Sequence, residues 1–214
     1  MSDLILKICG LSTRETLTAA IDAGADWVGL VTFAPSPRHV SPVDAKPLAD
    51  LARGKTKIVS LSVNADDQLL DEIMTHVDPE IWQFHGKETA ERVAEVKTRY
   101  KRPVMKAIGV STIEDLEKIT PYRGVADYVL LDAKPPKDAI LPGGNGAAFD
   151  WTILNHLPAD IEFMLSGGLS VETVADAVRS TRAFGMDVSS GVESSSGVKD
   201  IALIKRFIEN ARAA

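Results

Sequence analysis

The sequence predicts a single α/β domain folded as a closed (β/α)8 barrel of the TIM type. Three observations indicate it: apolar strand-like runs recur along the chain, helical patterns lie between them, and 214 residues suffice for the fold. The compact form of this barrel begins near about 200 residues. Eight strand-like runs begin near Leu4, Asp26, Lys57, Glu80, Pro103, Ala126, Ile161 and Phe184.

Amphipathic patterns predict helices between these strands. Apolar residues recur at i, i+3, i+4 and i+7 in Leu17 to Gly24, Val171 to Val178 and Ile204 to Ala211. Helix starts are marked by a capping box in Ser12 with Glu15 and in Ser111 with Glu114, and by a cap followed by proline in Ser41-Pro42.

The alternative architecture is a doubly wound open sheet. The barrel is favoured because the eight strands leave no antiparallel remainder and no G-x-G-x-x-G follows the first strand. No linker divides the chain, so residues 1–214 form one predicted domain. The Gly/Pro-rich stretch 133–148 after the sixth strand is longer than a usual βα loop, and it is either a lid or a disordered insertion.

Charge and composition exclude several classes of protein. The 24 basic and 30 acidic residues give a net charge of −6, which disfavours binding to nucleic acid. No apolar run approaches the roughly 20 residues of a membrane helix. Asp3 and Lys7 interrupt any signal-like segment, so a cytoplasmic location is expected. The single cysteine and the unpatterned histidines predict no disulfide within the chain and no metal site.

Active sites of such barrels lie at the C-terminal ends of the strands, so the polar residues there are the candidates. Lys7 and Cys9 share the inward face of the first strand, and Asp132 ends the sixth strand. A lone cysteine is usually a small buried apolar residue. Lys7 is nevertheless expected to lower the pKa of the Cys9 thiol, and a desolvated Asp132 held protonated facing it across the barrel would supply an acid.

Two glycine-containing segments after the seventh and eighth strands suggest an anion site. The residues are Gly167 and Gly168, which lead into a helix, and Ser190 and Gly191. Backbone N–H groups at such positions bind phosphate in many barrels, although each segment alone is equally an ordinary turn.

Three further polar residues are candidates for binding. Arg38, in a proline-stiffened loop, has the fork that binds a carboxylate in two hydrogen bonds, although a solvated loop arginine is the commoner role. Gln83 and His85 share the inward face of the fourth strand, where they either bind a ligand or form a polar pair in the barrel floor.

Seven motifs resemble those of one family. They are KICG at 7–10, SPR at 36–38, QFHG at 83–86, LLDA at 130–133, GGNGAAFDW at 143–151, LSGGL at 165–169 and DVSSGVE at 187–193. Together they make the chain similar, essentially end to end, to the phosphoribosylanthranilate isomerases of tryptophan biosynthesis. LSGGL alone recurs among phosphate-binding barrels, whereas KICG, LLDA and SGVE in that order are specific.

The resemblance implies an Amadori rearrangement of N-(5-phosphoribosyl)anthranilate to 1-(2-carboxyphenylamino)-1-deoxyribulose 5-phosphate without a cofactor. It implies that Asp132 is the general acid and Cys9 the general base. Arg38 would hold the anthranilate carboxylate, Asp187 a sugar or amine group, and the glycine loops the phosphate. Residues 133–148 would then act as a lid. Family members occur as monomers and dimers, so the sequence leaves the oligomeric state undecided.

Two other functions remain open at this point. A different isomerase, epimerase or lyase on a phosphate-binding barrel would share LSGGL without needing Cys9 and Asp132. A non-catalytic module would bind phosphate esters without turnover, which a turnover assay would detect.

Overall fold

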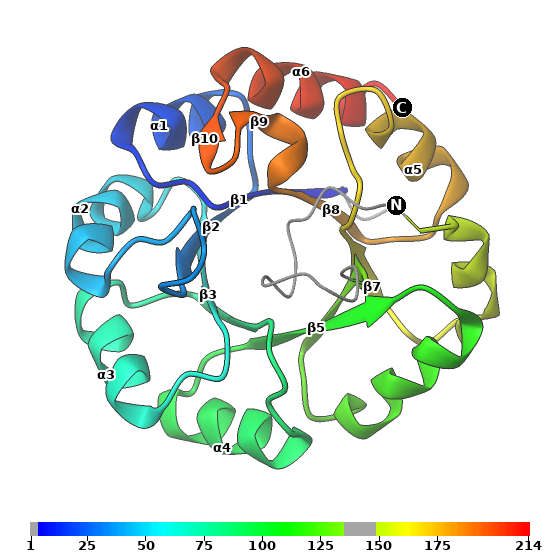
Figure 1. Ribbon diagram of the computed structural model, residues 1–214, viewed down its shortest axis with the longest axis horizontal. Helices are drawn as coiled ribbons and strands as arrows, with labels where there is room; N and C mark the ends of the chain where they lie inside the picture. The colour runs from blue at the N-terminus through cyan, green and yellow to red at the C-terminus, as the bar shows by residue number, and fades with distance from the viewer. Residues whose placement is uncertain (1–3, 135–148) are drawn as a thin grey trace.

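The computed structural model of the protein describes residues 4–134 and 149–214. Eight parallel strands close into a barrel in sequential order, with β8 paired to β1, and helical segments surround it (Figure 1). The strands are β1 (Ile5–Cys9), β2 (Trp27–Thr32), β3 (Lys57–Ser62), β4 (Ile81–Phe84), β5 (Val104–Val110), β6 (Tyr128–Ala133), β7 (Phe163–Leu165) and β8 (Gly185–Val188). The predicted (β/α)8 barrel is therefore confirmed, and the open sheet is excluded.

In the parts of the chain that the structure describes, one helical segment follows each of β1 to β8, besides a short 3-10 turn directly after β8. These segments are α1 (Arg14–Asp22), α2 (Pro42–Ala52), α3 (Asp67–His76), α4 (Ala90–Tyr100), the 3-10 segments η1 (Ile113–Tyr122) and η2 (Trp151–His156), α5 (Val174–Ser180) and α6 (Ile201–Arg212). Pro121 lies inside η1 and lacks the N–H that a continued α-helical ladder would need at that point.

Two of the predicted helix caps are displaced by one residue. The cap of α1 is Thr13, whose side chain accepts a hydrogen bond from the N–H of Thr16, rather than Ser12. In η1 the capping box joins Thr112 and Asp115, rather than Ser111 and Glu114. In both cases the residue one position later than predicted accepts the hydrogen bond from the third N–H of the turn. The cap predicted at Ser41, followed by Pro42, is confirmed.

The chain also forms an element that the sequence did not predict. After β8, the short turn η3 (Ser190–Val192) leads into an antiparallel hairpin of β9 (Glu193–Ser195) and β10 (Val198–Lys199). The prediction of no antiparallel remainder is therefore wrong. In Figure 1 this hairpin lies at the rim of the barrel between α1 and α6.

Alternation along the strands creates two apolar regions. Outward residues such as Leu6 and Ile8 pack against the helices, and inward residues such as Val59 and Met105 fill the barrel. At the N-terminal end of the barrel the rings of Trp27, Tyr128 and Phe184 lie within 6.3 Å of one another. Apolar side chains thus fill the N-terminal end of the interior, and buried polar residues such as Gln83 and Asp132 lie toward the opposite end.

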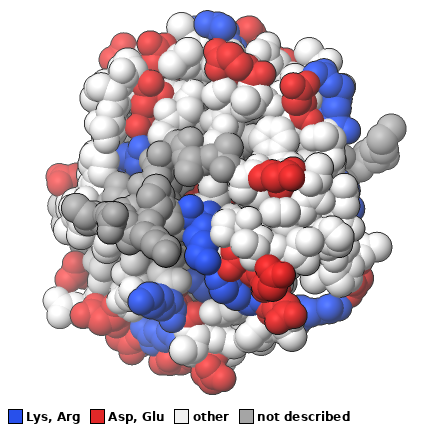
Figure 2. Space-filling view, turned by 45° about the vertical axis from the view of Figure 1, so that its right-hand side comes forward, with Lys and Arg blue, Asp and Glu red and all other residues white. Residues whose placement is uncertain are grey.

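The surface carries interspersed charges. Figure 2 shows acidic and basic side chains side by side on the face in view. Ion pairs between helices, such as Arg99 with Asp71, are part of this surface charge pattern. Among the described residues, no helix is long and apolar enough to cross a membrane.

Candidate active site at the C-terminal mouth of the barrel

A buried ion pair lies below the mouth, where β1 and β8 are neighbours. Lys7 and Asp187 are partners in the strand register, and the ammonium donates to Oδ1 of the carboxylate at 2.8 Å. Ser166 at the end of β7 donates to Oδ2 at 3.3 Å. Burial lowers the pKa of Lys7, but Asp187 and Cys9 together outweigh it and the net direction is upward. Lys7 has no exposed surface, so it acts on groups at the mouth through the residues that surround it.

Cys9 ends β1 one inward position above Lys7. It is a buried free thiol, and its sulfur leans over Gly29 of β2, where a Cβ would lie only 2.7 Å from Sγ. Burial raises the pKa of the Cys9 thiol and Asp187 adds to this, whereas Lys7 acts in the opposite direction. The net direction is upward. Lys7 acts in the expected direction, but desolvation outweighs its charge, so the pKa of the thiol lies above rather than below its ordinary value.

A hydrogen-bonded chain joins β4 to β6. Nε2 of Gln83 lies 3.2 Å from Nδ1 of His85, and Nε2 of His85 lies 3.1 Å from Oδ2 of Asp132. Because an amide nitrogen only donates, Nδ1 of His85 accepts and the ring proton sits on Nε2, which donates to Asp132. The structure thus brings together three predicted site residues, and two of them support the third.

The two glycine segments pack against each other. Gly167 and Gly168 both have left-handed backbone angles, with φ of 81° and 70°. A Cβ on Gly191 would overlap the carbonyl oxygen of Leu169, so only glycine permits η3 to approach the loop after β7 this closely. The predicted phosphate residues therefore form one surface made of backbone.

Arg38 is held by a carboxylate that the sequence analysis did not single out. Its Nε and Nη2 donate to the two carboxylate oxygens of Glu193 on β9 at 2.6 and 2.9 Å. The same carboxylate accepts from Lys199 on β10 at 2.6 Å and from the N–H of Gly197 at 3.0 Å. Arg38 is 5 % exposed, so the loop between β2 and α2 is fastened to the hairpin by a buried cluster.

The family model for N-(5'phosphoribosyl)anthranilate (PRA) isomerase matches residues 6–210. The chain belongs to the phosphoribosylanthranilate isomerase family. A relative from Bradyrhizobium diazoefficiens named N-(5'-phosphoribosyl)anthranilate isomerase is 54% identical over 210 residues, which cover 98% of this chain and 94% of the relative.

Solved structures agree with this membership. The phosphoribosyl anthranilate isomerase of Thermotoga maritima has a TM-score of 0.88 at 34% identity and covers 99% of this chain and 100% of its own. A second isomerase structure, in complex with reduced 1-(o-carboxyphenylamino)-1-deoxyribulose 5-phosphate, has a TM-score of 0.85 at 33% identity with the same coverage. The chain is accordingly an isomerase of tryptophan biosynthesis.

Within this isomerase, two functional candidates escaped sequence reasoning. Glu193 is the last residue of the DVSSGVE motif, and its place in that motif is the one feature of the sequence that points to it. Lys199 carries no sequence signal, because it reaches Glu193 through a hairpin that the pattern of strands did not reveal. Of the predicted lid, residues 135–148 lie outside the described residues.

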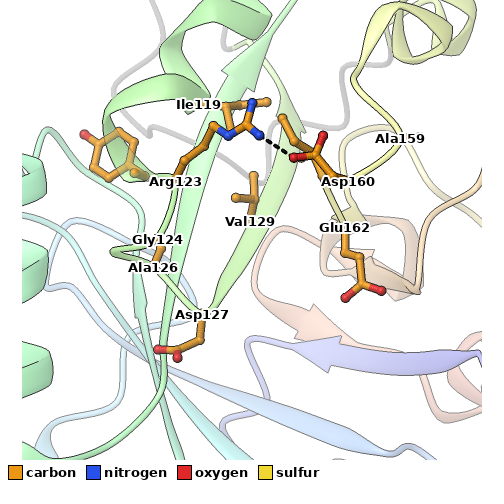
Figure 3. A pocket seen from close by; sticks show the side chains of 11 residues that line it. Ile119, Arg123, Gly124, Ala126, Asp127, Val129, Ala159, Asp160 and Glu162 are labelled. Atoms are coloured by element: carbon orange, nitrogen blue, oxygen red, sulfur yellow. Dashed lines mark hydrogen bonds and ion pairs between the residues drawn. The ribbon is translucent and has the colours of Figure 1, made fainter.

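The isomerase also has a pocket on its opposite side. A cavity of about 460 Å³ is lined by the end of η1, the residues just before β6 and the segment before β7. Figure 3 shows Arg123 reaching across it to pair with Asp160. Asp127 and Glu162 mark the N-terminal ends of β6 and β7, whereas barrel chemistry takes place at the C-terminal ends. This pocket is therefore not the active site. Among the described residues, no group of three potential ligands could hold a metal ion.

Proposed function

We propose that Asp132 and Cys9 are the general acid and base of the Amadori rearrangement of N-(5-phosphoribosyl)anthranilate. The observation that carries this is their placement. Both residues are buried near the C-terminal ends of their strands at one mouth, Asp132 beside His85 and Cys9 beside Lys7. Barrel closure through β8 leaves only β7 and β8 between their strands. The groups therefore border one space from two sides.

Asp132 performs the first step of the proposed mechanism. It donates a proton to the ring oxygen of the aminoaldose as the bond from C1 to that oxygen breaks, and the nitrogen lone pair forms the protonated imine. His85 already donates to Oδ2 of Asp132, so the transferred proton resides on Oδ1. Oδ1 faces the loop after β7, where a Cβ on Gly167 would lie 2.9 Å from it.

Cys9 performs the second step. Its thiolate removes the proton from C2, and the electron pair moves toward the imine to give the enolamine, which tautomerises to the ketone. The chemistry is redox-neutral and needs only proton transfers, so the proposal includes no cofactor. Lys7 lies below Cys9 and its positive charge stabilises the thiolate, which offsets part of the cost of burial.

The substrate is held at its two ends in this proposal. Arg38 binds the anthranilate carboxylate, and the backbone surface of Gly167, Gly168, Ser190 and Gly191 binds the phosphate. Fixing both ends places C1 and C2 between the acid and the base. The entropy cost of bringing the reacting groups together is then met by substrate binding rather than in the chemical step. Asp187 holds Lys7, and Gln83 and His85 orient Asp132. The proposal extends to a cytoplasmic location, in keeping with a biosynthetic isomerase.

Turnover of purified variants tests the assignment. Cys9→Ser and Asp132→Asn should each lower kcat by about 100-fold or more while the Kd of a product analogue changes little, because a general acid or base contributes at least that factor. A folded Cys9→Ser variant that keeps more than about a tenth of the wild-type kcat would overturn the base assignment.

Arg38→Met provides the complementary experiment, because it removes binding rather than chemistry. We expect its KM to rise while an analogue without the carboxylate binds wild type and variant alike. Unequal binding of that analogue would give Arg38 a different role.

A further inference from the structure

Lys199 is a buried cation that the reaction steps above do not use. Its side chain is 1% exposed, and its ammonium donates to the carbonyl oxygen of Ser189 at 2.9 Å and to Oγ of Ser189 at 3.2 Å. Ser189 Oγ in turn donates to the carbonyl oxygen of Cys9 at 3.1 Å. One serine therefore links Lys199 on β10 to the residue proposed as the base.

The hairpin holds this ammonium from the other side. Glu193 accepts a hydrogen bond from Lys199 at 2.6 Å and also accepts one from Arg38, so the Lys199 side chain is fixed between β9 and the end of β8. At the turn, a Cβ on Gly197 would lie 2.6 Å from the carbonyl oxygen of Pro37, which shows how closely the hairpin approaches the loop that carries Arg38. Burial lowers the pKa of Lys199, and Glu193 opposes this by stabilising the ammonium.

The charges around Cys9 come from several elements and do not act alike. Lys7 on β1 is accompanied by Asp187 on β8, and these two groups act on the thiol with opposite signs. Lys199 lies on the rim side and favours the thiolate. Its own counter-charge, Glu193, is shared with Arg38. His85 on β4 and Asp132 on β6 lie at the same mouth and are hydrogen-bonded to each other.

We propose that Lys199 is a further positioning residue of the active site, whose ammonium, fixed by Glu193 and Ser189, supports the thiolate form of Cys9. The inference rests on the proposed role of Cys9 as base. It also assigns a function to the hairpin, because the Glu193 carboxylate positions both Arg38, which binds the substrate, and Lys199, which acts on Cys9. Lys199 acts through Cys9 and does not itself touch the reacting atoms.

Ultraviolet absorbance of the thiolate tests this directly, because Cys9 is the only cysteine of the chain. Each variant is titrated with pH, and the same variant carrying Cys9→Ser is subtracted. Lys199→Met should raise the titration midpoint by about one unit, since an opposite charge at close range shifts a pKa by that order. Lys199→Arg, which keeps the charge, should stay near wild type. Lys205→Met, which removes an exposed lysine from α6, should also match wild type.

The sign of the shift separates this role from a structural one. A variant that merely loosened the hairpin would admit water to Cys9 and move its raised midpoint down toward the ordinary value, whereas loss of the cation moves it up. An unchanged or lowered midpoint in Lys199→Met would overturn the inference. Lys7→Met is a poorer probe, because it leaves the buried Asp187 carboxylate without its cation.

The pH profile of kcat/KM distinguishes this inference from the function on which it rests. We expect the limb of the Lys199→Met profile that reports Cys9 to move upward together with the thiolate midpoint. If the midpoint moves and the limb does not, the role of Lys199 toward the thiol is supported and the assignment of Cys9 as base is overturned.

Discussion

Gly167→Ala tests how the loop after β7 is fitted to the acid. Gly167 has φ of 81°, and a Cβ added there would overlap the backbone nitrogen of Ala133, lie 2.7 Å from Cβ of Ala133 and lie 2.9 Å from Oδ1 of Asp132. The substitution therefore combines an unfavourable backbone conformation with a collision against the end of β6. The two closest atoms are the backbone nitrogen and the Cβ of Ala133, which cannot move independently of the strand, so relief requires movement of the strand or the loop.

The magnitude follows from these two contributions. A left-handed conformation costs an alanine about 1 to 2 kcal/mol, and overpacking in a close-packed region adds about 1 to 3 kcal/mol. Gly167→Ala should thus lower the free energy of unfolding by about 2 to 5 kcal/mol. Gly54 is the matched control, because it has φ of 75° and no heavy atom within 4 Å of its added Cβ. Gly54→Ala should cost only the backbone contribution.

Urea unfolding of the two variants measures the difference, and steady-state turnover measures its consequence. Because displacement of β6 moves Asp132, kcat of Gly167→Ala should fall about 10-fold or more, as expected for a misplaced catalytic group. Gly54→Ala should retain wild-type kcat. Equal losses of stability in the two variants would refute the argument from the collision, and an unchanged kcat in Gly167→Ala would refute the coupling to Asp132.

Three other expectations follow from single contacts. Gly29→Ala should lower kcat by about 100-fold with little change in KM, since its Cβ would lie 2.7 Å from Sγ of Cys9; kinetics at saturating substrate check this, and wild-type kcat would contradict it. Phe207→Ala should lower the unfolding free energy by about 3 to 5 kcal/mol in a urea titration, because the ring is fully buried beneath α6. Although burial raises the pKa of Asp115, hydrogen bonds from Lys118 and from Ser111 hold it well below its usual range, so the stability that it contributes is present above pH of about 4 and is lost as pH falls. Asp115→Asn should therefore cost about 1 to 3 kcal/mol at neutral pH and progressively less in acid, and a cost independent of pH would exclude this contribution.

The architecture of the barrel could be predicted from the amino-acid pattern alone. Strand starts predicted from apolar runs lie within two residues of β1 to β8, because each parallel strand is buried on both faces and leaves a continuous apolar segment. Alternation within a strand also placed Lys7 and Cys9 on one face, and Gln83 and His85 on another. These patterns are local, so a linear reading is sufficient to find them.

The charges that meet at the mouth could not be predicted in this way, because they are brought together by the folding of the chain. Glu193 lies 155 residues from Arg38, and Asp187 lies 180 residues from Lys7, so neither pairing leaves a periodic trace in the chain. The direction of the Cys9 pKa was likewise beyond the sequence, because it depends on whether desolvation or the nearby cations dominate, and burial depends on the packing of the whole barrel. The hairpin that carries Lys199 was missed for a related reason: its two short strands are exposed for much of their length, and what holds them in place is a buried ion cluster rather than apolar alternation.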